Sequence, residues 1–238
     1  MARRRSDAEL RGLPDLARPG LEILFVGINP GLTSARVGHY YAGPGNLFWR
    51  CLHESGLTPT RWTWADDHRL LDLGIGIIDC VPRPTRSSSD LRAADFRTAT
   101  PHLLERLARY RPRIVCFNGL TAYRACIDPA APLGLQARRI AGAVVFVVPS
   151  TSAANARFSR AERVAWFVRL RELRDALRAG SGDRERLPPA GGRYTNGEPS
   201  GPRPVHPENL DAQRPRAPEP RSLALPERTP PRRAATRR

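Results

Sequence analysis

Four short runs of apolar residues stand out along the first 150 positions of the chain. They consist mostly of β-branched, leucine and aromatic residues, with almost no polar position among them. This pattern is typical of strands that are covered on both faces in a parallel sheet. The runs span residues 22–26, 76–78, 113–117 and 143–148.

The segments between and after these runs carry apolar residues at every third or fourth position, which places them on one face of a helix. The first helix would begin at Asn46, a favourable N-cap residue, and end at Gly56. The predicted helices span residues 46–56, 95–110 and 160–177. Strands that alternate with helices predict an α/β fold with three layers, α/β/α, around a central, mainly parallel sheet.

The composition divides the 238 residues into three parts. Residues 181–238 contain 12 of the 24 prolines and 12 arginines against 7 acidic residues, and no apolar periodicity. Such a segment cannot bury enough apolar surface to offset the cost of ordering. We therefore expect a basic, flexible N-terminal arm at 1–20, a folded domain at 21–180, and a disordered Pro/Arg-rich tail at 181–238.

The chain is strongly basic, with a formal net charge of +16, and all 39 of its basic residues are arginine. Residues 21–180 alone keep a net charge of +9, so the basicity does not come only from the tail. A basic domain indicates an anionic partner, most often nucleic acid. The alternative is a solvated surface whose arginine content reflects the base composition of the genome.

The four cysteines, Cys51, Cys80, Cys116 and Cys126, show no spacing typical of a zinc site, an iron–sulfur cluster or a disulfide framework. We therefore expect no metal and no other cofactor. The N-terminus lacks the apolar core of a signal peptide, and no apolar stretch is long enough to span a membrane. These features predict a monomer in the bacterial cytoplasm, associated with the nucleoid and not with a membrane.

Small polar residues follow each of the four predicted strands. Because ligands in parallel sheets bind outside the carboxyl ends of the strands, these residues predict one shared site. Its expected members are Asn29, Asp79, Asn118, Ser150 and Ser152.

The loop after the first strand, Gly27-Ile28-Asn29-Pro30-Gly31, is not a phosphate-binding loop. It lacks the further glycines or the Gly-Lys-Ser/Thr that such loops require, and Pro30 has no N–H to donate to a phosphate. Pro30 stiffens the preceding residue, so the Asn29 amide could hold one water or one base edge in a fixed position. The alternative is a turn in which the asparagine only shapes the loop.

Five motifs, in order, resemble the mismatch-specific uracil/thymine-DNA glycosylase family over about residues 20–178, and they are closer to its thymine-DNA glycosylase branch. They are GINPGL (27–32), GHYYAGPGNLFW (38–49), GIGIIDCVPRPT (74–85), RPRIVCFNG (111–119) and VPSTSAANARFSRAERV (148–164). The resemblance implies an α/β/α domain that hydrolyses the N-glycosidic bond of uracil or thymine mispaired with guanine in double-stranded DNA.

The resemblance also implies roles for individual residues. Asn29 would be the catalytic residue that positions the attacking water, and Tyr41 would stack on the flipped base. The resemblance further implies that Ile28 and Thr85 contact the base. The base pocket would then comprise these two residues together with Asp79 and Asn118 from the strand ends, and the loop shape would depend on Gly27, Pro30 and Gly31. A second loop would grip the DNA and enter the gap left by the base, through Ser150, Ser152, Ala153, Ala154, Asn155 and Arg157.

The chain departs from the thymine branch at two positions. Ala154 stands where that branch has an intercalating arginine, although Arg157 is near in sequence. Asp79 stands where that branch has asparagine; facing the pocket, it could act as a further base or change which base edges are accepted, and outside the pocket it would only cap a turn. Two other functions remain open, a mismatch-binding protein without cleavage and a small-molecule enzyme that binds nucleobases.

Overall fold

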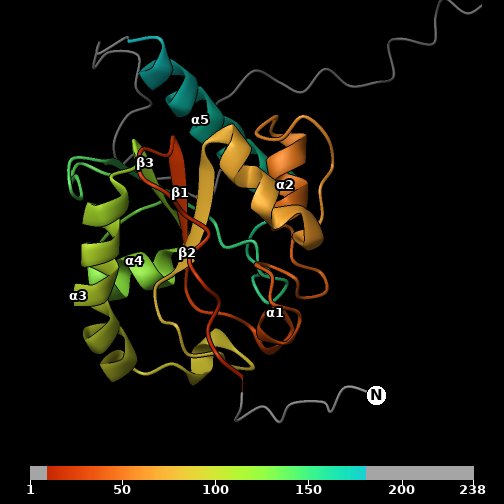
Figure 1. Ribbon diagram of the computed structural model, residues 1–238, viewed down its shortest axis with the longest axis vertical. Helices are drawn as coiled ribbons and strands as arrows, with labels where there is room; N and C mark the ends of the chain where they lie inside the picture. Colours follow the sequence, from red (N-terminus) through yellow and green to blue (C-terminus); the bar gives the residue numbers. More distant parts are fainter. Residues whose placement is uncertain (1–9, 181–238) are drawn as a thin grey trace, which may run out of the picture. The chain divides into compact units, whose positions relative to one another are not determined.

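The computed structural model describes residues 10–180. At its centre lies a five-stranded sheet in the order β2-β1-β3-β5-β4 (Figure 1). Four strands are parallel, and the short β4 pairs antiparallel with β5. The strands are β1 (Ile23–Gly27), β2 (Ile75–Asp79), β3 (Ile114–Asn118), β4 (Gly134–Leu135) and β5 (Val144–Val148). Every residue of the four parallel strands is buried, which confirms the strands that the apolar runs predict.

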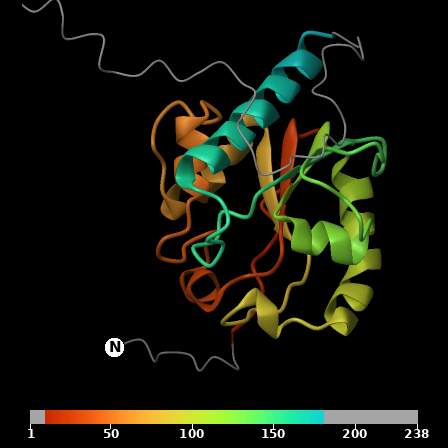
Figure 2. The ribbon, with the colours of Figure 1, turned by 180° about the vertical axis from the view of Figure 1, so that it is seen from behind.

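Helices cover both faces of this sheet, as the two opposite views show (Figures 1 and 2). The helical elements are α1 (Leu32–Val37), α2 (Phe48–Glu54), η2 (Trp64–Leu73), η3 (Ser88–Asp90), α3 (Ala93–Tyr110), α4 (Leu120–Cys126) and α5 (Arg160–Arg178). α2 and α5 pack on the face that carries Phe25, whereas α3 and α4 pack on the face that carries Leu24 and Val26. The predicted three-layer α/β/α architecture is therefore confirmed.

Local sequence explains where the longest helix begins. The Ser159 side chain accepts a hydrogen bond from the Glu162 N–H at 3.2 Å, and the Glu162 carboxylate accepts one from the Ser159 N–H at 2.7 Å. This reciprocal pair satisfies two of the donors left open at a helix N-terminus. α5 can therefore start directly after the second loop and hold it against the sheet.

The three predicted helices are present, and their ends differ from the prediction by no more than two residues. α2 begins at Phe48, not at Asn46, although the Asn46 Oδ1 still accepts a hydrogen bond from the Phe48 N–H at 3.0 Å. The sequence pattern misses α1, α4, β4, η3 and the longer η2. The first four are too short to show enough apolar repeats, and η2 is a 3₁₀ segment of 10 residues, whose three-residue turn differs from the α-helical period.

The expectation of a flexible arm over residues 1–20 is wrong for residues 10–20. Leu16 forms an antiparallel bridge with Ile77 of β2, and Leu13 and Leu16 pack against the core. The Asp15 carboxylate lies 2.8 Å from the Arg106 guanidinium of α3. Burial of two leucines and an ion pair hold this segment on the domain, which therefore begins before residue 21.

Residues 1–9 and the predicted tail at 181–238 lie outside the described range. Within residues 10–180, no helix combines the length and apolar character needed to cross a membrane.

Candidate active site

The strand ends singled out by the sequence come together in the structure. A cavity of about 490 Å³ opens where β1, β2, β3 and β5 end. α1 itself, the residues that precede and follow it, and residues 85–88 at the start of η3 complete the walls of the cavity. Nearly all predicted site residues line it: Gly27, Ile28, Asn29, Pro30, Gly31, Tyr41, Asp79, Thr85, Asn118, Ser150, Ser152, Ala153 and Ala154. Asn155 and Arg157 are not among the lining residues.

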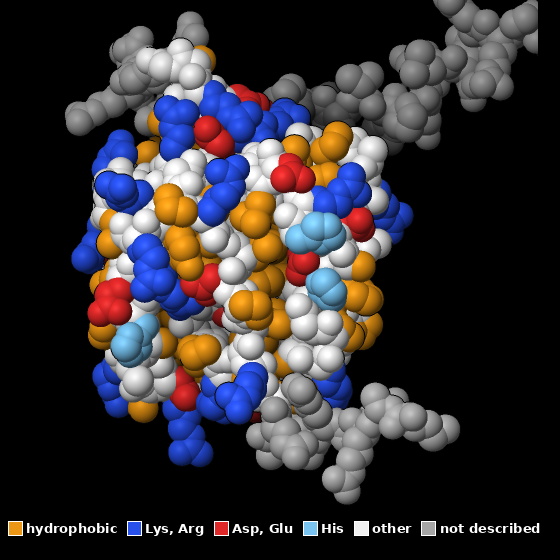
Figure 3. All heavy atoms as spheres, viewed as in Figure 1, with side chains coloured by type: hydrophobic (Ala, Val, Ile, Leu, Met, Phe, Trp, Pro, Cys, Tyr) orange, Lys and Arg blue, Asp and Glu red, His pale blue; other side chains and the backbone are white. Residues whose placement is uncertain are grey.

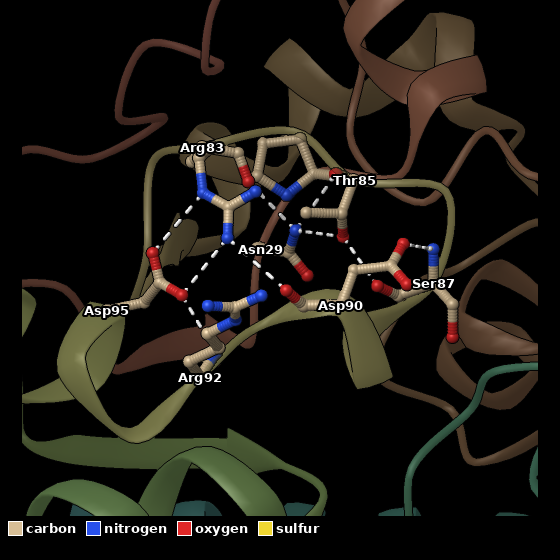
Figure 4. Close-up of polar contacts among 8 residues, drawn as sticks. Asn29, Arg83, Thr85, Ser87, Asp90, Arg92 and Asp95 are labelled. Carbon is tan, nitrogen blue, oxygen red and sulfur yellow. Dashed lines mark hydrogen bonds and ion pairs between the residues drawn. The ribbon is translucent and has the colours of Figure 1, made fainter.

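The Asn29 side chain is fixed through its amide nitrogen (Figure 4). Nδ2 donates to the Thr85 Oγ1 at 2.7 Å, to the Arg83 carbonyl at 2.8 Å and to the Pro30 carbonyl at 3.3 Å. Among residues 10–180, no hydrogen bond uses its Oδ1. The acceptor oxygen of a half-buried, immobilised amide is therefore available to a ligand or a water.

The partners of Asn29 are themselves held in place. Thr85 Oγ1 donates to the Ser87 carbonyl at 2.7 Å, which leaves its lone pairs to accept from Asn29. The Arg83 guanidinium donates two hydrogen bonds to the Asp95 carboxylate, from Nη2 to Oδ2 at 3.0 Å and from Nε to Oδ1 at 3.2 Å (Figure 4). That arginine lowers the pKa of the Asp95 carboxyl. Sequence reasoning missed Arg83, although it lies within a motif that resembles the family.

The floor of the cavity requires a glycine at position 27. An added Cβ at Gly27 would stand 2.3 Å from the Asp79 Oδ1 and 3.1 Å from the Tyr41 hydroxyl oxygen. No side chain larger than hydrogen fits so close to a carboxylate. Asp79 and Tyr41 therefore both reach the floor beneath the β1 terminus.

On this floor the Asp79 Oδ2 is buried without a hydrogen-bond partner among the described residues. The buried Tyr41 hydroxyl donates to none of them, and the Asn118 side chain interacts with its oxygen. Burial raises the pKa of Asp79 to about 7, against the opposing effect of the nearby Arg106. Burial also raises the pKa of Tyr41, and the charge of Asp79 adds to the effect. Since unpaired buried polar groups are costly, these atoms are places where a water or a ligand can supply the missing partners.

Tyr41 is held in an uncommon backbone conformation, with φ at +54°. The N–H of the next residue, Ala42, donates to the Ser34 Oγ at 3.0 Å. The Tyr41 ring stacks on Phe48 of α2, with centroids 3.9 Å apart and planes 25° from parallel. Phe48 thus covers one face of the ring and fixes its plane beside the cavity, a support that the sequence did not reveal.

Asn118 has a structural task besides lining the cavity. Its Nδ2 donates to the Thr151 Oγ1 at 2.9 Å, and its Oδ1 accepts from the Thr151 N–H at 3.1 Å. This reciprocal pair ties the end of β3 to the second loop. Thr151, fully buried and absent from the sequence-based site, is therefore the residue that anchors this loop.

The second loop is held at its base and open at its tip. The Asn155 Nδ2 donates to the Ser150 carbonyl at 3.0 Å, and the Arg163 guanidinium of α5 donates to the Asn155 carbonyl. Ala153 and Ala154 are exposed. The Arg157 guanidinium lies over the Phe158 ring, 5.7 Å from its centroid. Asn155 therefore supports the loop, and Arg157 points to its own neighbour in this conformation.

Basic side chains are distributed around the domain. Arg36 and Arg86 are among the residues that line the cavity. On the face shown in Figure 3, arginine side chains are spread over the surface, with acidic side chains between them. Such a surface attracts polyanions without a single dominant patch.

Comparison with known proteins gives two findings. Residues 14–173 match the model of the Uracil DNA glycosylase superfamily. A solution NMR structure from Methanosarcina acetivorans, provisionally described as a uracil DNA glycosylase, is 28% identical and covers 68% of this chain and 98% of that chain, with a TM-score of 0.43.

Proposed function

This chain belongs to the uracil DNA glycosylase superfamily, and we propose that it is a monofunctional glycosylase that removes uracil mispaired with guanine from double-stranded DNA. Thymine and other modified pyrimidines opposite guanine are further candidate substrates, as the resemblance to the mismatch-specific branch suggests. The reaction would start base excision repair. The observation that carries the proposal is the immobilised amide of Asn29 inside a cavity at the carboxyl ends of the parallel strands.

The proposed role of Asn29 follows from its hydrogen bonds. Because Nδ2 is committed to three protein acceptors, Oδ1 can accept a hydrogen bond from a water. A water that donates to Oδ1 keeps a lone pair for attack on the sugar carbon. An amide cannot take up the proton as a carboxylate does, so the step gains from water placement and from the departing base.

Leaving-group stabilisation would come from the floor of the cavity. A departing uracil carries negative charge, and donors aimed at that charge favour the transition state. The Tyr41 hydroxyl stays protonated, and its proton is not used in a hydrogen bond within residues 10–180. Below its raised pKa, the Asp79 carboxyl is neutral and can also donate. We therefore expect better leaving groups, uracil and 5-halouracils, to react faster than thymine.

Base flipping would supply the remaining selectivity. A mismatched base leaves the stack more cheaply than a properly paired one. In the cavity it would stack on Tyr41, which Phe48 supports from the other side. The second loop would contact the DNA through Ser150 and Ser152, with the small Ala154 at the position of the wedge.

The test uses labelled duplexes that contain G·U, G·T or A·U, and single-stranded DNA that contains uracil, followed by alkaline cleavage of abasic sites. We expect cleavage of G·U to be fastest and of G·T to be slower, with A·U and single strands below G·U. Absence of cleavage at G·U with enzyme equal to DNA would overturn the proposal in favour of a mismatch binder. Equal rates on G·U, A·U and single strands would keep the glycosylase but remove its mismatch preference.

A further inference from the structure

Two cysteines that are far apart in the sequence lie against each other behind the cavity floor. Cys80 directly follows β2, and Cys126 is the last residue of α4. Their sulfur atoms are 3.3 Å apart. A disulfide has its sulfurs about 2.05 Å apart, so a small displacement would bring the two into bonding distance.

The two thiols differ in access and in acidity. Cys80 is fully buried, whereas Cys126 is partly exposed. Either sulfur can be the donor in the hydrogen bond between them. Because burial disfavours the charged thiolate, the partly exposed Cys126 thiol ionises more readily than the buried Cys80 thiol. An accessible thiol with greater thiolate character beside a second thiol is the combination found in oxidant-sensitive cysteines.

The movement needed for a bond would fall mainly on Cys126. The Cys80 N–H donates to the Gly27 carbonyl at 2.9 Å, and the Arg106 guanidinium donates to the Asp79 carbonyl at 2.8 Å. These bonds hold the backbone around Cys80 in the sheet. Cys126 closes a helix of only 7 residues, whose end can shift more easily.

We propose that Cys80 and Cys126 form a redox pair that hydroperoxides convert into an intramolecular disulfide. The Cys126 thiolate attacks the terminal peroxide oxygen and the O–O bond breaks, which oxidises Cys126 to a sulfenic acid and reduces the peroxide; hydroxide leaves from hydrogen peroxide, and an alkoxide leaves from an organic hydroperoxide. The Cys80 sulfur then attacks the Cys126 sulfur, the S–O bond breaks, and the oxygen leaves as water with the Cys80 proton. A thiol reductant returns both residues to the reduced form.

The other two cysteines serve as internal controls. Cys51 and Cys116 are fully buried, and burial raises the pKa of both thiols. Neither has a sulfur neighbour among residues 10–180. Both should stay reduced while the pair reacts, so the proposal predicts one specific disulfide in preference to general oxidation.

Peptide mapping of the full-length protein tests the proposal, because trypsin places each cysteine in a separate peptide. After hydrogen peroxide treatment and alkylation of the remaining thiols, we expect peptide 70–86 to be joined to peptide 125–138. Peptides 51–61 and 114–124 should be alkylated, and dithiothreitol should abolish the joined species. Cys126→Ser should lose the link, and the control Cys51→Ser should keep it.

A second readout does not depend on glycosylase activity. The disulfide would restrict the unfolded chain, so the oxidised wild type should melt at a higher temperature than the reduced form, and Cys126→Ser should show no such difference. Oxidation of Cys126 to sulfinic acid without a link would overturn the proposal. So would equal oxidation of Cys51 and Cys116.

Discussion

The two walls of the cavity are built in different ways. In the wall formed by residues 27–31 and 83–87, the side chain that faces the cavity is itself fixed, since Asn29 donates to three acceptors. In the second loop the anchors lie at the base, through Thr151 and Asn155, and the tip is exposed. On the proposed function, the first wall would be preorganised for the chemistry, and the exposed tip of the second would be the part that adapts to DNA.

The largest effect is expected from Asn29→Ala, which tests whether the first wall performs the chemistry. If the first wall performs the chemistry, the variant should lose about 10²- to 10³-fold in the rate of base release, because the water loses its acceptor. Its affinity for G·U duplex should change little, since binding depends on other groups. Single-turnover rates and a binding titration measure both effects. A rate near that of wild type would remove Asn29 from the reaction.

A second effect is expected from the free-energy cost of burying Asp79 in its charged form on the cavity floor. Its folded pKa of about 7 lies above the unfolded value near 3.8, so the folded state binds the proton more tightly. Stability should therefore fall as pH rises from about 4 to 7 and then level off, by about 2–4 kcal/mol. Asp79→Asn should remove this part of the slope. Urea denaturation of both proteins at pH 5 and pH 8 gives the difference.

The expected sign is specific. The free energy of unfolding of Asp79→Asn minus that of wild type should be more positive at pH 8 than at pH 5. An equal difference at the two pH values would mean that Asp79 has an ordinary pKa in the folded protein.

A smaller effect should follow from Thr85→Val, which removes one of the three acceptors of the Asn29 amide, the one at 2.7 Å. Loss of one such hydrogen bond costs about 1 kcal/mol, so the rate of base release should fall roughly 5- to 10-fold. Thr100→Val is a matched control, because the Thr100 hydroxyl donates to the Phe96 carbonyl within α3. If both variants lose the same activity, the effect is one of general stability and not of Asn29 position.

The sequence predicts the layers of this fold well because the parallel strands are buried on both faces. Such strands leave continuous apolar runs, and the longer helices leave a clear 3.6-residue stripe. Residues 10–20 escaped prediction because their attachment depends on Leu13, Leu16 and Asp15, whose partners lie elsewhere in the chain. The short α1, α4 and β4 carry too little periodicity to be recognised.

The candidate site was predictable at the strand ends, where topology brings residues together. The contacts that hold its side chains were not, because the groups that fix Asn29 and Asn118 come from distant positions in the chain. Thr85 lies 56 positions beyond Asn29, and Thr151 lies 33 beyond Asn118. The raised pKa of Asp79 depends on burial in three dimensions, and the contact between Cys80 and Cys126 spans 46 positions.

The most direct test of the difference between the walls pairs Asn29→Ala with Asn155→Ala, which removes the amide that supports the Ser150 carbonyl. For each variant, the single-turnover rate at saturating enzyme and the Kd for G·U duplex are measured together. The account predicts that Asn29→Ala loses rate and keeps affinity, while Asn155→Ala loses several-fold in affinity and keeps most of its rate. Equal losses of rate and affinity in both variants would contradict it.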